Sequence, residues 1–143
     1  MTINQISVFL ENRPGTLAEL TETLAASGIN MRAMSLADTS DFGIARIIVD
    51  NASDTADILR KDDYIVNITP VLALEIPDKA GSLNSILKLL GEKGRNVEYM
   101  YGFTGRNTNS AYMIMRTTNI PAAEEVLEDA GIHLIGEKDL SSL

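Results

Sequence analysis

The fold is decided by a stretch that occurs twice: Glu11-Asn12-Arg13-Pro14-Gly15-Thr16-Leu17 and, 66 residues later, Pro77-Asp78-Lys79-Ala80-Gly81-Ser82-Leu83. A second landmark, Gly28-Ile29-Asn30, returns as Gly94-Arg95-Asn96 at the same offset. Two landmarks that keep their spacing indicate a duplicated unit. The chain of 143 residues is therefore expected to contain two copies of one fold.

The residues around each landmark predict a strand followed by a helix. Apolar residues alternate with others before each loop, as in a strand with one buried face, at Ile6, Val8 and Leu10 and again at Leu72, Leu74 and Ile76. Beyond each loop, apolar residues recur at the spacing of an amphipathic helix, at Leu17, Leu20 and Leu24 and again at Leu83, Ile86, Leu87 and Leu90. Gly28 and Gly94 then stand where a left-handed residue closes a helix.

The second half of each copy predicts a hairpin, a helix and a short strand. The hairpin strands are expected at 31–36 and 42–49, and at 97–103 and 111–115, on either side of turn-forming residues. The second helices are expected at 54–61, with Ser53 as N-cap, and at 122–130, with Pro121 in the first turn. Final strands are expected at 65–69 and 132–135.

This order of elements predicts an α+β fold of two tandem ferredoxin-like βαββαβ units, each an antiparallel sheet with its helices on one face. The expected domains are residues 1–70 and 71–143, because only Pro70 separates the last strand of the first unit from Val71. Each unit has roughly 70 residues, which is close to the lower limit for an independent core. The two units are therefore expected to stabilise each other.

The composition argues against several classes of function. A formal charge of −8 disfavours a nucleic-acid partner, since phosphate binding needs clustered Lys and Arg. An RNA-binding sheet stays an alternative, because Tyr99, Tyr101 and Phe103 alternate along one strand. The chain has no cysteine, no long apolar run and no secretion signal at its start. We therefore expect a cytoplasmic protein without a membrane partner.

We expect no enzymatic activity, because groups that move protons or bind metals are scarce. His133 is the only histidine, and the carboxylates are dispersed along helices and loops. No glycine-rich phosphate loop is present. The sequence thus predicts no catalytic residue, no metal site and no cofactor. An alternative is an acyl-phosphate hydrolase on the same fold, in which Arg13 and Asn30 would act on the substrate.

The repeated loop combines groups that suit a small zwitterion. Its glycine lets the backbone approach a bound group closely, and the N–H groups of the following helical turn favour a carboxylate. Asn12 or Asp78 offers an oxygen to an ammonium group. The structural alternative is that Asn12 and Asp78 only satisfy the loop, while Thr16 and Ser82 only cap the helices.

The opening run from Ser7 to Leu17, continued by Ser27-Gly28-Ile29-Asn30, resembles the start of an ACT domain, a small regulatory module of amino-acid metabolism. The second copy, from Ile76 to Val97, resembles it as well, so the likeness covers nearly the whole chain. The opening motif is similar to that of the regulatory subunit of acetohydroxyacid synthase. The resemblance implies the βαββαβ fold and the binding of amino acids at interfaces between paired domains.

Carried over by position, the resemblance implies a ligand site at each loop and at the start of the next strand. The second loop departs from the first, since Ala80 replaces the proline and Asp78 the asparagine, and the first is the preferred site if only one binds. The implied residues are Asn12, Arg13, Pro14, Gly15, Thr16, Leu17, Asn30 and Met31 in the first copy, and Asp78, Lys79, Ala80, Gly81, Ser82, Leu83 and Asn96 in the second.

The leading hypothesis is therefore a pair of ACT-like units that binds a small amino acid and transmits its presence to a partner. A homodimer and a regulated metabolic enzyme are the expected protein partners. The alternative is a module without a ligand that assembles through exposed sheet edges, with the strand 97–103 as the favoured edge.

Overall fold

The computed structural model describes residues 1–143 as two compact units. The N-terminal unit is Asn4–Thr69, and the C-terminal unit is Pro70–Leu143 together with Met1–Ile3. The chain passes from one unit to the other inside a single strand, β4 (Ile65–Pro77), where two separate strands were predicted. The domain bounds 1–70 and 71–143 stay predictions.

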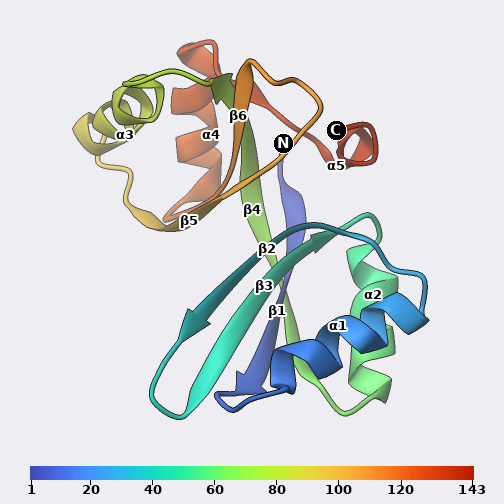
Figure 1. Cartoon of the computed structure of the whole chain (residues 1–143). Coiled ribbons are helices and arrows are strands. Elements are labelled where there is room, and N and C mark those ends of the chain that lie inside the picture. Colours follow the sequence, from blue (N-terminus) through green and yellow to red (C-terminus); the bar gives the residue numbers. More distant parts are fainter. The chain divides into compact units, whose positions relative to one another are not determined.

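The N-terminal unit has the predicted order of elements. Its strands lie in the order β2-β3-β1-β4, and β3 pairs antiparallel with both β1 and β2. The helices α1 and α2 lie on one face of these strands (Figure 1). The elements before β4 are β1 (Ile3–Glu11), α1 (Thr16–Ala26), β2 (Met31–Asp38), β3 (Phe42–Val49) and α2 (Ala52–Lys61).

The core of the N-terminal unit lies between its sheet and its two helices. The alternating residues Ile6, Val8 and Leu10 are buried there, as predicted, against Leu20 and Leu24 of α1. Each such side chain contributes about 1.5–3 kcal/mol by leaving water. This burial fixes the face of β1 and therefore the direction in which the β1–α1 loop leaves the sheet.

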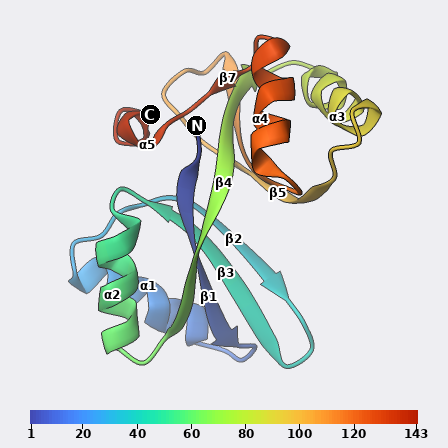
Figure 2. The same ribbon diagram turned by 180° about the vertical axis from the view of Figure 1, so that it is seen from behind.

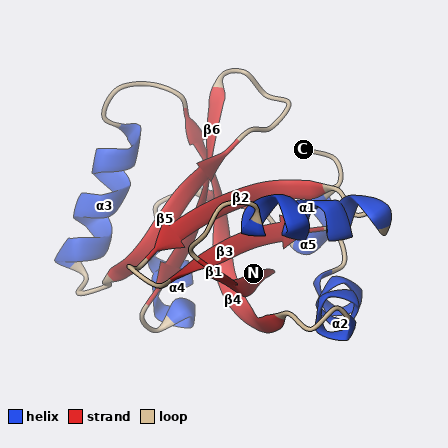
Figure 3. Ribbon diagram, turned by 60° about the horizontal axis from the view of Figure 1, so that its bottom comes forward, coloured by secondary structure: helices blue, strands red, loops and turns tan.

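The C-terminal unit repeats the arrangement, with the strand order β5-β6-β4-β7 (Figure 2). Leu72, Leu74 and Ile76 are buried with Ile86 and Leu90, as the sequence predicts. Figure 3 distinguishes the helices of the unit from its strands. Its further elements are α3 (Ser82–Glu92), β5 (Val97–Phe103), β6 (Ser110–Thr117), α4 (Ile120–Asp129), β7 (His133–Leu134) and α5 (Glu137–Leu140).

Three local predictions are wrong or incomplete. The N-cap of α2 is Asn51 and not Ser53, because the Asn51 side chain accepts a hydrogen bond from the N–H of Asp54 at 3.1 Å. The last strand was expected at 132–135, but β7 has only two residues. The short helix α5 was not predicted. In contrast, Gly28 and Gly94 close their helices with φ of 71° and 70°, as expected. No helix of the structure has the length and apolarity to span a membrane.

Candidate functional site: the strand-to-helix loops

A glycine begins the first helix of each unit in a backbone conformation that other residues rarely adopt. Gly15 has φ 90° and ψ −15°, and Gly81 has φ 91° and ψ −13°. Apart from the adjoining residues in the chain, no protein atom lies within 4 Å of the position that a Cβ would occupy at either residue. Glycine is therefore needed for the turn rather than for packing, and the space beside it is open to a ligand.

The first turn of α1 presents free amide groups next to this open space. The N–H of Glu19 donates to the carbonyl oxygen of Gly15 at 2.9 Å, whereas the N–H groups of Leu17 and Ala18 have no protein acceptor. Unpaired N–H groups and the positive end of the helix dipole favour a negatively charged group at this position. The turn is thus suited to a carboxylate.

Asn12 joins the loop to the β2–β3 turn. Its Nδ2 atom donates to the carbonyl oxygen of Thr39 at 3.0 Å, and its backbone N–H donates to the carbonyl oxygen of Asp41 at 3.2 Å. The Oδ1 atom of Asn12 accepts no hydrogen bond from the protein. The side chain therefore both holds the loop and leaves an oxygen for an external donor, so the structural and the ligand-binding interpretations of Asn12 are compatible.

Arg13 and Thr16 hold the loop from its other side. The Arg13 Nε lies 2.8 Å from Oε2 of Glu11, and this hydrogen bond raises the pKa of the Arg13 guanidinium above its ordinary value. The Thr16 hydroxyl donates to the carbonyl oxygens of Glu11 and Arg13 at 2.9 and 3.1 Å. Thr16 is thus the first residue of α1 and a brace of the loop, while Gly15 occupies the cap position.

A small hollow of about 120 Å³ lies between this loop and the β2–β3 hairpin. Asn12, Arg13, Gly15, Thr16 and Leu17 all line it, so the structure brings together five of the predicted residues; Pro14 is exposed and does not line it. Residues that the sequence analysis did not select also line the hollow: Leu10, Glu11, Leu36, Asp38 and Gly43. Asp38 lies between the hairpin strands expected at 31–36 and 42–49, where the sequence predicts only a turn.

Two predicted residues of the first copy lie elsewhere. Met31 begins β2, whereas Asp38, beside the loop, ends it, so the length of the strand separates them. Met31 packs against the core of the N-terminal unit, and Asn30 lines a different hollow of about 210 Å³ near Asp50. Within one chain, the structure does not bring Asn30 or Met31 to the loop.

The second loop has the same backbone but fewer side-chain contacts. The N–H of Asp78 donates to the carbonyl oxygen of Asn109 at 2.9 Å, which matches the pairing of Asn12 with Asp41. The side chains of Asp78 and Ser82 make no hydrogen bond within the protein, and Leu83 packs against the core. Lys79, Ala80, Gly81 and Ser82 line a hollow of about 350 Å³ together with Ile132, whereas the predicted residues Asp78 and Leu83 do not line it.

Asn96 lies apart from this second hollow, just as Asn30 lies apart from the first. Its carbonyl oxygen accepts a hydrogen bond from the N–H of Thr118 at 3.1 Å, so the residue joins the start of β5 to the end of β6. The two copies therefore agree in leaving this asparagine apart, but they differ at the loop, because Asn12 and Leu17 line the first hollow whereas Asp78 and Leu83 do not line the second.

A wider groove of about 620 Å³ adjoins the first loop along α1 and is acidic. It shares Arg13 and Thr16 with the small hollow, and its carboxylates are Glu19, Glu22, Asp62 and Asp63 in addition to Glu11. Burial raises the pKa of the Tyr64 hydroxyl at the groove. These carboxylates repel the carboxylate group of a zwitterion. The small hollow is therefore the better place for such a ligand.

Comparison with known proteins identifies a matching family model and solved structures with a similar fold. A family model described as an ACT domain pair matches residues 1–143. A search of curated proteins finds no match. The solved structure of protein BT0572 from Bacteroides thetaiotaomicron is 38% identical, with a TM-score of 0.93, and the match covers 100% of this chain and 98% of that chain.

Two more distant structures are regulatory subunits of aspartate kinase. The ligand-free form from Thermus thermophilus is 16% identical, with a TM-score of 0.63 and coverage of 89% of this chain and 91% of that chain. The subunit from Thermus flavus is also 16% identical, with a TM-score of 0.62 and coverage of 90% and 92%. At this identity the likeness concerns the fold, and it agrees with two tandem ferredoxin-like units.

Proposed function

The chain belongs to the ACT domain family, and on that premise we propose that it is a regulatory protein without catalytic activity that binds a small amino acid at the β1–α1 loop. The observation that supports this most directly is the hollow beside Gly15, which is lined by Leu17 with its free N–H, by Asn12 with its unpaired amide oxygen and by the carboxylate residues Glu11 and Asp38. These groups match the two charges of an amino acid.

The proposed ligand lies with its carboxylate at the first turn of α1 and its ammonium group toward the hairpin. The N–H groups of Leu17 and Ala18 donate to the carboxylate, and Arg13 adds a positive charge nearby. The Oδ1 atom of Asn12 and the carboxylate of Asp38 accept from the ammonium group. The hollow of about 120 Å³ is smaller than the roughly 300–1,000 Å³ of drug-sized sites, which favours a short side chain.

The loop of the C-terminal unit is a second candidate within the same proposal. Asp78 would replace Asn12 as the acceptor for the ammonium group, and α3 begins with the same glycine conformation. We assign the first loop as the principal site, because only there is the predicted acceptor held in place by its own side-chain hydrogen bond, from Asn12 to Thr39.

We further propose a homodimer in which β2 pairs with β2 of a second copy. β2 is the end strand of its unit, and it exposes Met34 and Leu36 by 39% and 51%. Antiparallel pairing centred on Ser35 would place Met34 opposite Leu36 and Arg32 opposite Asp38, so that apolar and opposite charges match.

This dimer would also account for the predicted residues that one chain leaves apart. In an antiparallel pair, the start of one β2 lies beside the end of the other, so Asn30 and Met31 of a second copy would approach the loop around Gly15. The proposal includes a metabolic enzyme that responds to the bound state, in keeping with the role that the family resemblance implies. If the ligand binds more tightly to one of two packings of the units, its binding would shift the protein toward that packing.

Assembly without any ligand is the second candidate function, and the same exposed edge favours it. A screen of the twenty amino acids by thermal shift, followed by calorimetry, separates the two. A ligand at 100 times its Kd raises the free energy of unfolding by about 2.7 kcal/mol, a clear rise in melting temperature. We expect one or a few small amino acids to act on the wild type and to lose their effect in Asp38→Ala.

Asp129→Ala is the matched control for that variant, because it removes an exposed carboxylate away from both loops, and Asp78→Ala tests the second candidate site separately. A flat response of the wild type to all twenty amino acids would contradict ligand binding and leave assembly as the function. An unchanged response in both Asp38→Ala and Asn12→Ala would place the ligand away from the first loop.

A further inference from the structure

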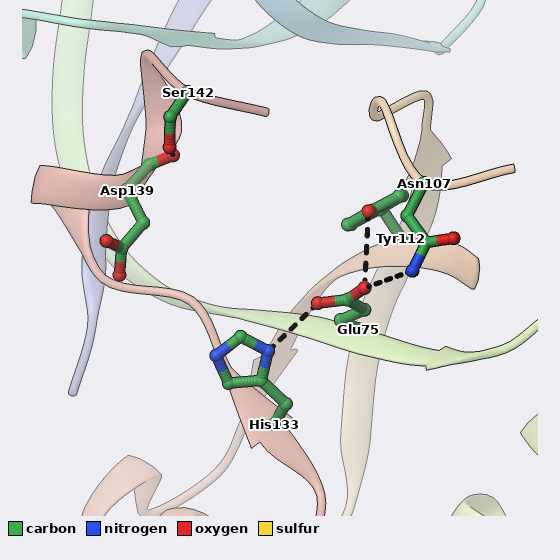
Figure 4. A network of polar contacts seen from close by, with 6 residues as sticks. All are labelled: Glu75, Asn107, Tyr112, His133, Asp139 and Ser142. Carbon is green, nitrogen blue, oxygen red and sulfur yellow. Dashed lines mark hydrogen bonds and ion pairs between the residues drawn. The ribbon is translucent and has the colours of Figure 1, made fainter. Parts of the chain in front are cut away.

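A polar cluster lies on the C-terminal sheet around Glu75, which stands in β4 between Leu74 and Ile76, the residues that pack with α3 and α4 (Figure 4). Glu75 of β4 is its centre: Oε2 lies 2.9 Å from Nδ1 of His133, while Oε1 accepts from the hydroxyl of Tyr112 at 3.3 Å and from Nδ2 of Asn107 at 3.4 Å. These donors belong to β7, β6 and the loop 104–109. One carboxylate therefore bonds to three separate parts of the chain.

The duplication shows that the fold does not need this cluster. Glu75 is paired with Tyr112 across β4 and β6, and the corresponding pair across β1 and β3 of the N-terminal unit is Phe9 with Ile44. The N-terminal unit thus has an apolar pair at the position where the C-terminal unit has Glu75, whose side chain is only 21% exposed. Taking a carboxylate out of water is unfavourable unless it is hydrogen-bonded, so the cluster points to a role specific to the C-terminal unit.

The two segments that differ most from the first copy are the ones that Glu75 contacts. The loop 104–109 is longer than the turn between β2 and β3, and Asn107 attaches it to Glu75. The segment 133–143 begins with the short strand β7, continues into α5, and is attached through His133. Both additions meet at the same side chain.

Few other main-chain bonds hold these segments. β7 pairs with β4 through only two residues, followed by one hydrogen bond from the N–H of Ile135 to the carbonyl oxygen of Ala73. In the loop, the carbonyl oxygen of Asn109 accepts one main-chain hydrogen bond from the N–H of Asp78, and Gly105 lies against the ring of Tyr112, where a Cβ would come within 2.4 Å of a ring atom. With so few backbone bonds, these segments depend on side-chain attachments, which act together with the burial of Ile135 and Leu140 to keep them closed.

We propose that Glu75 is a latch, which fastens the loop 104–109 and the segment 133–143 to β4 and releases both together when it no longer accepts their hydrogen bonds. Release uncovers the ring of Tyr112 beneath Gly105 and frees Ile135 and Leu140, which are buried in the closed state. The latch thus links a hairpin loop and the C-terminal segment, which are far apart in sequence, and controls the exposure of apolar surface.

Protonation of Glu75 is one way to open the latch. Hydrogen bonds from Ser110 and His133 hold the pKa of Glu75 below its ordinary value, so the attachment persists in neutral and mildly acidic solution and is lost as the pH falls through the folded-state pKa. The titratable groups around it are His133 on β7 and Tyr112 on β6, and Asp139 of α5 faces the far side of the His133 ring (Figure 4).

Hydrogen exchange followed by mass spectrometry tests the latch in the full chain at neutral pH. We expect Glu75→Leu to speed exchange roughly tenfold in both segments, the effect of losing hydrogen bonds to a charged acceptor. Asn107→Ala should affect the loop 104–109 alone, and His133→Ala the segment 133–143 alone. Glu98→Gln is the matched control, since Glu98 pairs with Arg116 in the same unit, and it should change neither segment.

Wild-type exchange in either segment of Glu75→Leu would overturn the proposal, as would release of both segments by Asn107→Ala alone. Peptides from β1 and α1 report whether the variant is folded. If Glu75→Leu does not fold, a pH series on the wild type decides the matter: after correction for the intrinsic exchange rate, protection of the two segments must fall together as Glu75 is protonated, and separate transitions would refute a shared latch.

Discussion

The side-chain Nδ2 of Asn12 donates to the carbonyl oxygen of Thr39 at 3.0 Å, and this hydrogen bond distinguishes the two copies of the loop. The equivalent residue, Asp78, has a side chain without a hydrogen bond in the protein, although its backbone N–H bonds to Asn109 as that of Asn12 bonds to Asp41. The first loop is thus attached to its hairpin at two points and the second at one. A preformed loop loses less conformational entropy when a ligand binds.

Asn12→Ala should lower the free energy of unfolding by about 0.5–1 kcal/mol, because it removes one exposed hydrogen bond. Asp78→Ala, at the same position of the other copy, should change it by no more than about 0.5 kcal/mol. Urea denaturation followed by circular dichroism measures both. An Asn12→Ala variant as stable as the wild type would show that the Asn12 side chain contributes nothing to the stability of its loop.

Gly15→Ala should destabilise the protein by about 1–2 kcal/mol, since φ is 90° and the cost is that of a left-handed backbone in an L-residue. Open space beside the residue removes any steric contribution. Gly91→Ala is the control within α3, where alanine should stabilise the helix by about 0.5–1 kcal/mol. A neutral Gly15→Ala in thermal or urea denaturation would contradict a left-handed backbone at residue 15.

Asp50→Asn should reduce stability at neutral pH and have no effect in strong acid. Two hydrogen bonds from Arg32, at 2.9 and 3.0 Å, hold the pKa of Asp50 below its ordinary value of 3.8. The stabilisation is therefore complete above that value and disappears as the pH falls through the folded-state pKa. For this partly exposed pair we expect about 0.5–1 kcal/mol at pH 7.

Urea denaturation of the wild type and Asp50→Asn at pH 7 and at pH 2 to 3 measures this change. Asp129→Asn, at an exposed aspartate without an ion pair, should stay within about 0.5 kcal/mol of the wild type at both pH values. A difference between wild type and Asp50→Asn that persists undiminished in acid would mean that the ionised carboxylate is not what stabilises the folded state.

Leu36→Lys should convert the proposed dimer to single chains, because it places a charge in the centre of the paired β2 edge. Sedimentation velocity would then give a mass near the 15.5 kDa of one chain, where the wild type gives about twice that mass. Ile65→Lys is the control, since Ile65 is 69% exposed but lies on β4 and not on an end strand. Dissociation by Ile65→Lys instead would place the interface elsewhere.

Much of the fold is predictable because its signals are local. The spacing of Ile6, Val8 and Leu10 indicates one buried strand face, and the positive φ of Gly28 follows from the turn that a glycine permits at a helix end. The N-cap was misplaced because Asn51 and Ser53 are both good caps, and only the hydrogen bond to Asp54 distinguishes them. The helix α5 is short, and no local sequence pattern predicts it.

The candidate site is less predictable, since it joins residues that are distant in sequence. The loop 11–17 was identified from its glycine and amide oxygen, but Asp38 and Leu36 reach the hollow only through strand pairing. His133 offered no partner nearby in the sequence and proves to contact Glu75, 58 residues away. Its role in the latch follows from that contact alone.

By itself, the sequence determined the duplication, the order of elements and the two loops, because backbone conformation and side-chain periodicity depend on residues within a few positions of one another. Only the tertiary structure decided that Asn30 lies at the far end of β2 from the loop, that Asp38 lines the hollow, and that Glu75 gathers donors from three segments. The reason is that strand register sets these contacts, and register arises from the burial of whole sheet faces.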